Sequence, residues 1–334
     1  MTRAAYLLLL GGVALFVAVL VSQGVPAVVA ALTLAGWGLL LVALFHLVPL
    51  ALDAAAIRVL FKRGGARGSM RHALLARWVG ESANSLMPAG QIGGPLLMAR
   101  HLTQQGSSVH DAAAAIIVST TLQTVAQILF ALMGVALLGA QAGGHLSEHA
   151  LRTASLIASG VLAVQVGGFY LLQRRGLFSK IMRAGVRFAG KRDWSRWVSH
   201  AQSIDLSVEA TYGRAGPVAA SFSLSLIGWL VGTGEVFLIL ELLNNPVSWV
   251  NALVLESLGQ AIRGAAFAVP GALGVQEGGY LLLAPLAGLP PDMALALSLA
   301  KRAREIILGL PGLLYLRLSK SSSAAAAESK GPVT

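Results

Sequence analysis

Six apolar runs, each long enough to cross the roughly 30 Å hydrocarbon core of a bilayer, constrain the fold more than any other feature of the chain. They lie near residues 5–22, 27–60, 110–138, 151–172, 216–242 and 292–316. Only 12% of the residues are charged, which is about half the share in a typical soluble protein. The runs predict an all-α polytopic membrane helix bundle with one transmembrane domain, residues 1–318, and a disordered cytoplasmic tail, residues 319–334.

Two further apolar segments, 73–104 and 250–289, are broken by proline and glycine. Both segments contain a stretch that begins with Glu-Ser, continues through a proline and reaches a glutamine followed by a glycine pair. The matching stretches are ESANSLMPAGQIGGPLLM (81–98) and ESLGQAIRGAAFAVPGALGVQEGGYLLL (256–283). An acid, Asp111 or Asp292, then opens a full span. Two kinked spans without a cavity would also fit this pattern.

The basic residues predict the orientation of the spans. Lysine and arginine follow the second and fourth runs, whereas the turns near 23–26, 139–150, 243–249 and 288–291 contain neither. The positive-inside rule therefore places both termini in the cytoplasm. The basic segment 173–212 is predicted to be a helix on the cytoplasmic leaflet, or a loop that only sets orientation.

With this orientation, the two broken segments start from opposite sides of the membrane. The first follows a cytoplasmic loop and the second follows an outer turn, so they form an inverted repeat of broken or re-entrant helical segments. Inverted repeats with discontinuous helices are typical of alternating-access transporters, whose binding site lies near the bilayer midplane. The repeat therefore predicts a transporter.

Four charges interrupt the last apolar run, in SLAKRAREIILGLPG (298–312). A helix that opens at Asp292 places them about 13 to 20 Å below the outer surface. Each central charge costs on the order of 2.5 to 3.5 kcal/mol on insertion scales, which indicates a function. One acid cannot neutralise three bases, so other carboxylates or an anionic ligand must lie nearby. The acids in other apolar stretches are Glu81, Glu235, Glu256 and Glu277.

Two interpretations of these charges remain open. The first is an internal ion-pair network that locks the bundle. The second is a polar cleft whose surplus positive charge attracts a phosphate or another anionic headgroup, for which the planar arginine fork is suited. The second interpretation predicts the following substrate-binding residues: Lys301, Arg302, Arg304, Glu305, Glu277, Gln276, Pro270, Gly274, Glu256, Arg263, Glu81, Asn84 and Gln91. The scattered histidines, including His46, are interpreted as interface or packing residues.

The stretch VPGALGVQEGGYLLLAPLAGLPPDMALALSLAKRAREIILGLPGLL (269–314) is similar to the C-terminal half of a flippase-like membrane family. This family includes the transmembrane region of lysylphosphatidylglycerol synthase, and the closer resemblance is to its hopanoid-biosynthesis-associated HpnL branch. The resemblance implies a bacterial inner-membrane protein that moves or supplies polar lipids, with hopanoids as the implied cargo or pathway. The first broken segment departs from the family, which carries a Pro-x-Arg-x-Gly-Glu signature, because Pro88 is followed here by AGQIG.

The sequence therefore predicts a non-enzymatic lipid transporter that moves a polar or anionic lipid, such as an anionic phospholipid or a hopanoid, through a midplane cleft. One alternative is a membrane scaffold that docks lipid-biosynthesis enzymes on its basic cytoplasmic loop. Another is an intramembrane lipid-modifying enzyme. HLSEH (145–149) has the spacing of a zinc motif but lies in a short outer turn, and no nucleotide-binding loop is present. No metal, cofactor or nucleic-acid partner is expected.

Overall fold

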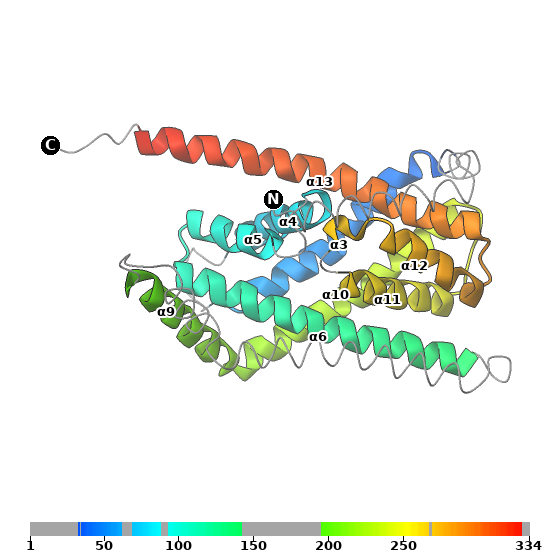
Figure 1. The fold of residues 1–334 in the computed structure, drawn as a ribbon, viewed down its shortest axis with the longest axis horizontal. Helices are drawn as coiled ribbons and strands as arrows, with labels where there is room; N and C mark the ends of the chain where they lie inside the picture. The colour runs from blue at the N-terminus through cyan, green and yellow to red at the C-terminus, as the bar shows by residue number, and fades with distance from the viewer. Residues whose placement is uncertain are drawn as a thin grey trace.

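The computed structural model describes residues 33, 35–61, 69–87, 93–141, 195–266 and 269–328. These residues form helices joined by turns and short irregular connections, with no strand among them, which confirms the predicted all-α class. The helices are α3 (Gly38–Arg58), α4 (Met70–Leu86), α5 (Gly93–Gln104), α6 (Val109–Gln141), α9 (Ser195–Tyr212), α10 (Ala215–Leu242), α11 (Trp249–Ala265), η3 (Pro270–Ala272), α12 (Val275–Leu283), η4 (Ala284–Ala287) and α13 (Pro291–Glu328), as labelled in Figure 1.

Three of the described helices, α3, α6 and α10, are long and apolar enough to cross a membrane. Large apolar side chains on these helices remain exposed, for example Leu44, Leu129 and Ile227, and lipid is the solvent that such a surface requires. The predicted runs 5–22 and 151–172 lie outside the described residues, and the run 292–316 lies in α13. The chain is a membrane protein, and its total of six full spans stays a prediction.

The first broken segment folds as a helical hairpin, called hairpin 1, made of α4 and α5. Ser69 caps α4 by accepting a hydrogen bond from the backbone N–H of His72. The helices then pair in antiparallel order, because Gly94 donates its N–H to Asn84 Oδ1 at 2.9 Å and Gly80 lies against Met98. The turn between them, which includes Pro88 and the predicted site residue Gln91, lies outside the described residues.

The close approach inside hairpin 1 requires glycine at position 94. A Cβ atom there would lie 2.6 Å from the carbonyl oxygen of Gly80, which is backbone and cannot rotate away. We expect Gly94→Ala to lower the free energy of unfolding by about 1–3 kcal/mol through overpacking. Gly278→Ala is the matched control, since no atom lies within 4 Å of its Cβ position. Thermal unfolding in detergent measures both, and equal unfolding temperatures would contradict the predicted contact.

The second broken segment forms hairpin 2, made of α11 and α12 with η3 between them. Arg263 Nη1 donates to Gln276 Oε1 at 2.7 Å across the hairpin, and Gly259 lies against the ring of Tyr280. Gly274, at φ +75°, forms the N-cap of α12 and donates its N–H to Glu277 Oε2 at 2.7 Å. This backbone angle favours glycine, and the Glu277 carboxylate satisfies an otherwise orphaned donor at the helix start.

The two halves of the bundle repeat one arrangement in opposite directions. The order long helix, hairpin, long helix is α3, hairpin 1, α6 in the first half and α10, hairpin 2, α13 in the second. In Figure 1, α6 and α13 run in opposite directions and the hairpins enter the bundle from opposite ends. Each hairpin also packs against the other half, α4 on α13 and α11 on α6. The inverted repeat predicted from the two Glu-Ser segments has this geometry.

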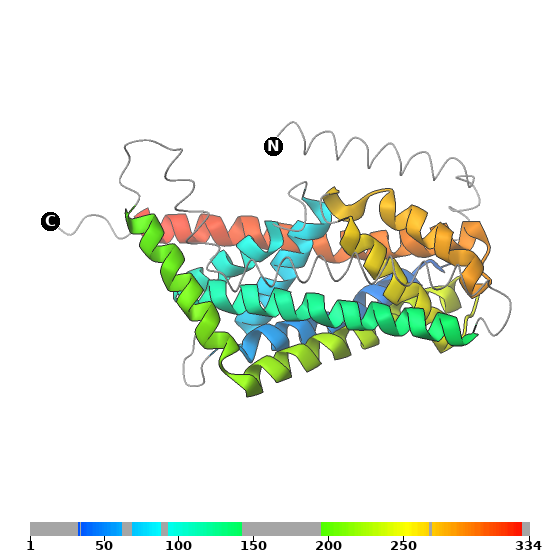
Figure 2. The same ribbon diagram turned by 60° about the horizontal axis from the view of Figure 1, so that its bottom comes forward.

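Two predicted cytoplasmic segments have only partial descriptions. Residues 173–194, with nearly all of the basic side chains, lie outside the described residues, and the remainder forms α9, which packs on α6 at one end of the bundle (Figure 2). Helix α13 continues to Glu328, into the segment 319–334 that the sequence predicts to be a disordered tail. Residues 324–327 are all alanine, the residue type with the strongest helix propensity.

Candidate functional site

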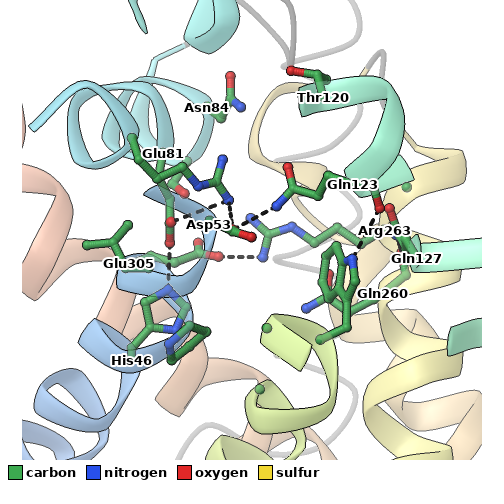
Figure 3. Close-up of a pocket in the computed structure, with 18 of the residues that line it drawn as sticks. His46, Asp53, Glu81, Asn84, Thr120, Gln123, Gln127, Gln260, Arg263 and Glu305 are labelled. Atoms are coloured by element: carbon green, nitrogen blue, oxygen red, sulfur yellow. Dashed lines mark hydrogen bonds and ion pairs between the residues drawn. The ribbon is translucent and has the colours of Figure 1, made fainter. Parts of the chain in front are cut away.

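A polar chamber of about 220 Å³ lies where the two hairpins meet. Residues of α3, α4, α6, α10, α11 and α13 line it, and Figure 3 shows a close-up. A cavity needs a volume of about 10–15 Å³, measured in the same way, to hold one water molecule, provided that polar groups surround it. The chamber is therefore large enough for several waters or for a small polar group, in helices whose outer surfaces are apolar.

Five ion pairs bring together most of the charges around the chamber. Each pair joins one cation to a different carboxylate: Arg77–Asp53 (2.7 Å), Arg263–Glu305, Lys301–Glu256 (2.7 Å), Arg302–Glu277 (2.9 Å) and Arg304–Glu235 (3.1 Å). The surplus positive charge predicted for the cleft is therefore wrong for the described residues. Each of the five cations finds its carboxylate within the bundle. These contacts support the interpretation as an internal ion-pair network.

Lys301 is the most deeply buried of these cations, with 1% of its side chain exposed. Its ammonium group donates to Glu256 Oε2 at 2.7 Å. Tyr280 donates its hydroxyl to the same oxygen at 3.2 Å, and Gln260 donates to Glu256 Oε1 at 2.8 Å. These bonds tie α13 to both helices of hairpin 2 and leave the Glu256 carboxylate well satisfied, as a buried charge requires.

Arg302 and Glu277 hold the tip of hairpin 2 and do not line the chamber. Arg302 donates to the carbonyl oxygens of Gly271 and Ala272 and to Glu305 Oε2. Glu277 is fully buried and also accepts a hydrogen bond from Ser298 at 3.3 Å. Of the predicted site residues here, Gln276 donates to the Ser298 hydroxyl at 3.0 Å, so it too links hairpin 2 to α13.

His46 lies between two carboxylates that belong to different helices. Its Nδ1 atom is 2.7 Å from Glu235 Oε2 on α10, and its Nε2 atom is 2.7 Å from Glu81 Oε1 on α4. Arg304 Nη1 lies 3.3 Å from the same Glu81 oxygen and 3.3 Å from His46 Nε2. This group joins α3, α4, α10 and α13, a role in the polar cluster that the interpretation of His46 as an interface or packing residue did not include.

The side of the chamber opposite Glu81 and Glu305 carries amide side chains (Figure 3). We call Gln123, Gln127 and Gln260 the amide wall. Gln127 donates to the Gln260 carbonyl oxygen at 2.7 Å and joins α6 to α11, while Gln123 donates to Asp53 at 2.7 Å. Because amides both donate and accept hydrogen bonds, this wall can bind uncharged polar groups.

The structure brings together most of the predicted site residues, but not all of them face the chamber. Those that line it are Glu81, Asn84, Glu256, Arg263, Arg304 and Glu305. Gly274, Gln276, Glu277, Lys301 and Arg302 lie behind this layer, the side chain of Pro270 is outside the described part, and so is Gln91. The HLSEH stretch also lies outside it.

Sequence reasoning missed several residues of the chamber. These are His46, Asp53, Arg77, Thr120, Gln123, Gln127, Trp229 and Gln260. Two of them carry a readable signal, since Asp53 is an acid within an apolar run and Arg77 precedes Glu81 by one helical turn. The glutamines carry no comparable signal, because single amides are tolerated in many spans.

The chain matches a known protein family. The family described as "Lysylphosphatidylglycerol synthase TM region" matches residues 5–312, which include both hairpins and all four of the long helices α3, α6, α10 and α13 up to residue 312. Comparison with curated proteins and with solved structures gives no match. The family named from the charged C-terminal stretch is thus confirmed, and the hopanoid-associated branch stays a prediction.

Proposed function

Since the chain belongs to the lysylphosphatidylglycerol synthase transmembrane family, we propose that it moves the polar headgroup of a membrane lipid between the two leaflets. The observation that carries this proposal is the polar chamber at the junction of two opposed hairpins. Discontinuous helices from inverted repeats line the substrate sites of many transporters. A polar cavity inside an apolar bundle is costly, and passage of a polar group accounts for it.

The size of the chamber indicates which part of the lipid enters it. A volume of about 220 Å³ accepts a headgroup and water, whereas acyl chains would remain in the bilayer beside the bundle. The amide wall and the exposed part of Arg263, of which 18% is accessible, would bind the headgroup. Asn84 and Thr120 lie at the edge of the same space (Figure 3).

The charges of the chamber favour a headgroup without net negative charge. All five cations of the cluster already contact a carboxylate, so an anionic headgroup would have to displace one of these acids. Five of the lining residues are acids, namely Asp53, Glu81, Glu235, Glu256 and Glu305. Zwitterionic or uncharged polar lipids, which include hopanoids with polar side chains, are therefore the proposed cargo.

The proposal includes a location and a mode of action. The protein would act in a bacterial inner membrane, as the resemblance to the family implies. Both termini would lie in the cytoplasm, as the distribution of lysine and arginine predicts. It would transfer the lipid without changing a covalent bond, so it is proposed to be a transporter and not an enzyme. Its partners would be the lipids themselves.

Reconstitution in vesicles tests this function. Vesicles would carry phosphatidylcholine or phosphatidylglycerol labelled on the acyl chain with a fluorophore that dithionite quenches only in the outer leaflet. We expect the protein to make the inner pool of labelled phosphatidylcholine accessible at least about tenfold faster than in protein-free vesicles, and phosphatidylglycerol more slowly. Absence of exchange for every lipid tested, from a protein that remains folded, would contradict the proposal and favour the scaffold.

A further inference from the structure

The contacts of His46 require one more proton than a neutral imidazole carries. Both ring nitrogens lie 2.7 Å from a carboxylate oxygen, Nδ1 from Glu235 and Nε2 from Glu81. A neutral imidazole has one N–H, and its other nitrogen can only accept a hydrogen bond. Two acceptors at 2.7 Å repel each other, so both contacts are favourable only when the group of three side chains binds an additional proton.

The surrounding charges lead to the same conclusion. Glu81 is the one acid of the described cluster left over when each of the five cations is assigned its nearest carboxylate. With the additional proton, His46 supplies the matching positive charge and the described cluster is neutral. Without it, the cluster carries one uncompensated negative charge in a bundle that excludes most water, which is unfavourable.

The titratable and charged groups around His46 provide an alternative set of contacts for the deprotonated state. The charged groups in contact with it are Glu81 of α4, Glu235 of α10 and Arg304 of α13. Next to these lie Arg77 of α4, Asp53 of α3, and Lys301 and Glu305 of α13. When Nε2 carries no proton, Arg304 Nη1, at 3.3 Å, can donate to it. Glu81 can then turn to Arg77, whose Nη2 atom is 3.8 Å from Glu81 Oε2.

Glu81 is the member of the group that is free to move. Its side chain is 22% exposed and lines the chamber, whereas that of Glu235 is 2% exposed. Glu81 belongs to hairpin 1, and its contact with His46 is a direct link from that hairpin to α3. Loss of the proton to water in the chamber would therefore weaken the attachment of hairpin 1 and leave Glu235 in place.

We propose that His46, Glu81 and Glu235 form a proton site that adds a link from hairpin 1 to α3 when occupied and loosens the hairpin when empty, while the Arg77–Asp53 pair keeps it in the bundle. Movement of the lipid headgroup past hairpin 1 is then coupled to binding and release of one proton. This inference rests on the proposed lipid transport for its purpose. The proton site itself rests only on the contacts of His46 and can be tested without any transported lipid.

The position of hairpin 1 can be measured directly, because the chain contains no cysteine. Spin labels would be attached in the variant Leu96→Cys/Ile227→Cys, which marks exposed positions on α5 and α10. Distances would be recorded in lipid nanodiscs between about pH 5 and about pH 9, which spans histidine titration. We expect a second distance population to grow from below about 10% to a major fraction as the pH rises, since the proton is lost in that direction.

Three variants in this labelled background identify the group responsible. His46→Gln and Glu81→Gln are each expected to remove the pH dependence, and both are tested because either one could impair folding. His72→Gln, at the start of the same helix α4, is the matched control and should retain it. A wild-type distance that does not change with pH, or a change that persists in both His46→Gln and Glu81→Gln, would overturn the proposal. Failure of lipid transport would appear separately, as absence of exchange in vesicles.

Discussion

Replacing Lys301 with methionine is expected to lower the free energy of unfolding by about 3–5 kcal/mol, the cost of leaving a buried charge without its partner. Glu256, with 4% of its side chain exposed, would lose the ammonium group that lies 2.7 Å away. The hydrogen bonds from Tyr280 and Gln260 would remain, but neither of those donors is charged. Chemical denaturation of the purified protein in detergent measures the loss.

A second variant separates the ion pair from the packing of the lysine side chain. In Lys301→Met/Glu256→Gln the buried carboxylate is neutral, so most of the lost stability should return, because neutral replacements of a buried pair are often well tolerated. Arg317→Met, at an exposed position of the same helix, is the control and should change stability by less than about 0.5 kcal/mol. A double variant as unstable as Lys301→Met alone would contradict the pairing.

Gly232→Phe is expected to stop lipid exchange while leaving the protein folded. Gly232 lines the chamber from α10, and no atom lies within 4 Å of the position where a Cβ would be built. The Cβ atom of a phenylalanine therefore meets no neighbour, and we expect its ring to occupy part of the chamber assigned to the headgroup. We expect exchange of labelled phosphatidylcholine to slow at least about tenfold.

The control for Gly232→Phe is the variant Gly216→Phe. Gly216 also has open space around it and lies on the same helix, but it is exposed in the first turn of α10 and does not line the chamber. It should leave exchange within about twofold of the wild-type rate. Normal exchange in Gly232→Phe, with thermal stability like that of wild type, would mean that lipid crosses by another route.

The two hairpins show how much of the fold the sequence determines locally. Glycine and proline predicted two broken segments, because these two residue types disfavour a continuous helix. The shared Glu-Ser start, which lies inside a helix in both hairpins, only marked the segments as a repeat. The two segments follow loops on opposite sides of the membrane, which predicted the inverted orientation of the hairpins. The sequence did not reveal that each hairpin packs on the long helix of the other half, because that contact depends on side-chain shape over a large separation along the chain.

The charged cluster shows the limit of the same reasoning. Helical spacing places Glu305 three positions after Arg302, and the two groups lie 3.1 Å apart. The partners of Lys301 and Arg304 lie 45 and 69 positions away in the chain, so periodicity within one helix could not identify them. The predicted surplus of positive charge failed for this reason, and His46 was missed because a lone histidine in an apolar run has no local partner to mark it.

The most direct test of the central claim, that a lipid headgroup passes through this chamber, is to close it chemically. The variant Thr120→Cys adds the only cysteine of the chain at a lining position of α6, and Leu129→Cys marks the exposed apolar surface of the same helix as a control. We predict that a water-soluble methanethiosulfonate modifies the Thr120→Cys variant and slows its lipid exchange at least about tenfold. Reduction of the mixed disulfide should restore the original exchange rate. Absence of reaction at position 120, or unchanged exchange after complete modification, would contradict the account.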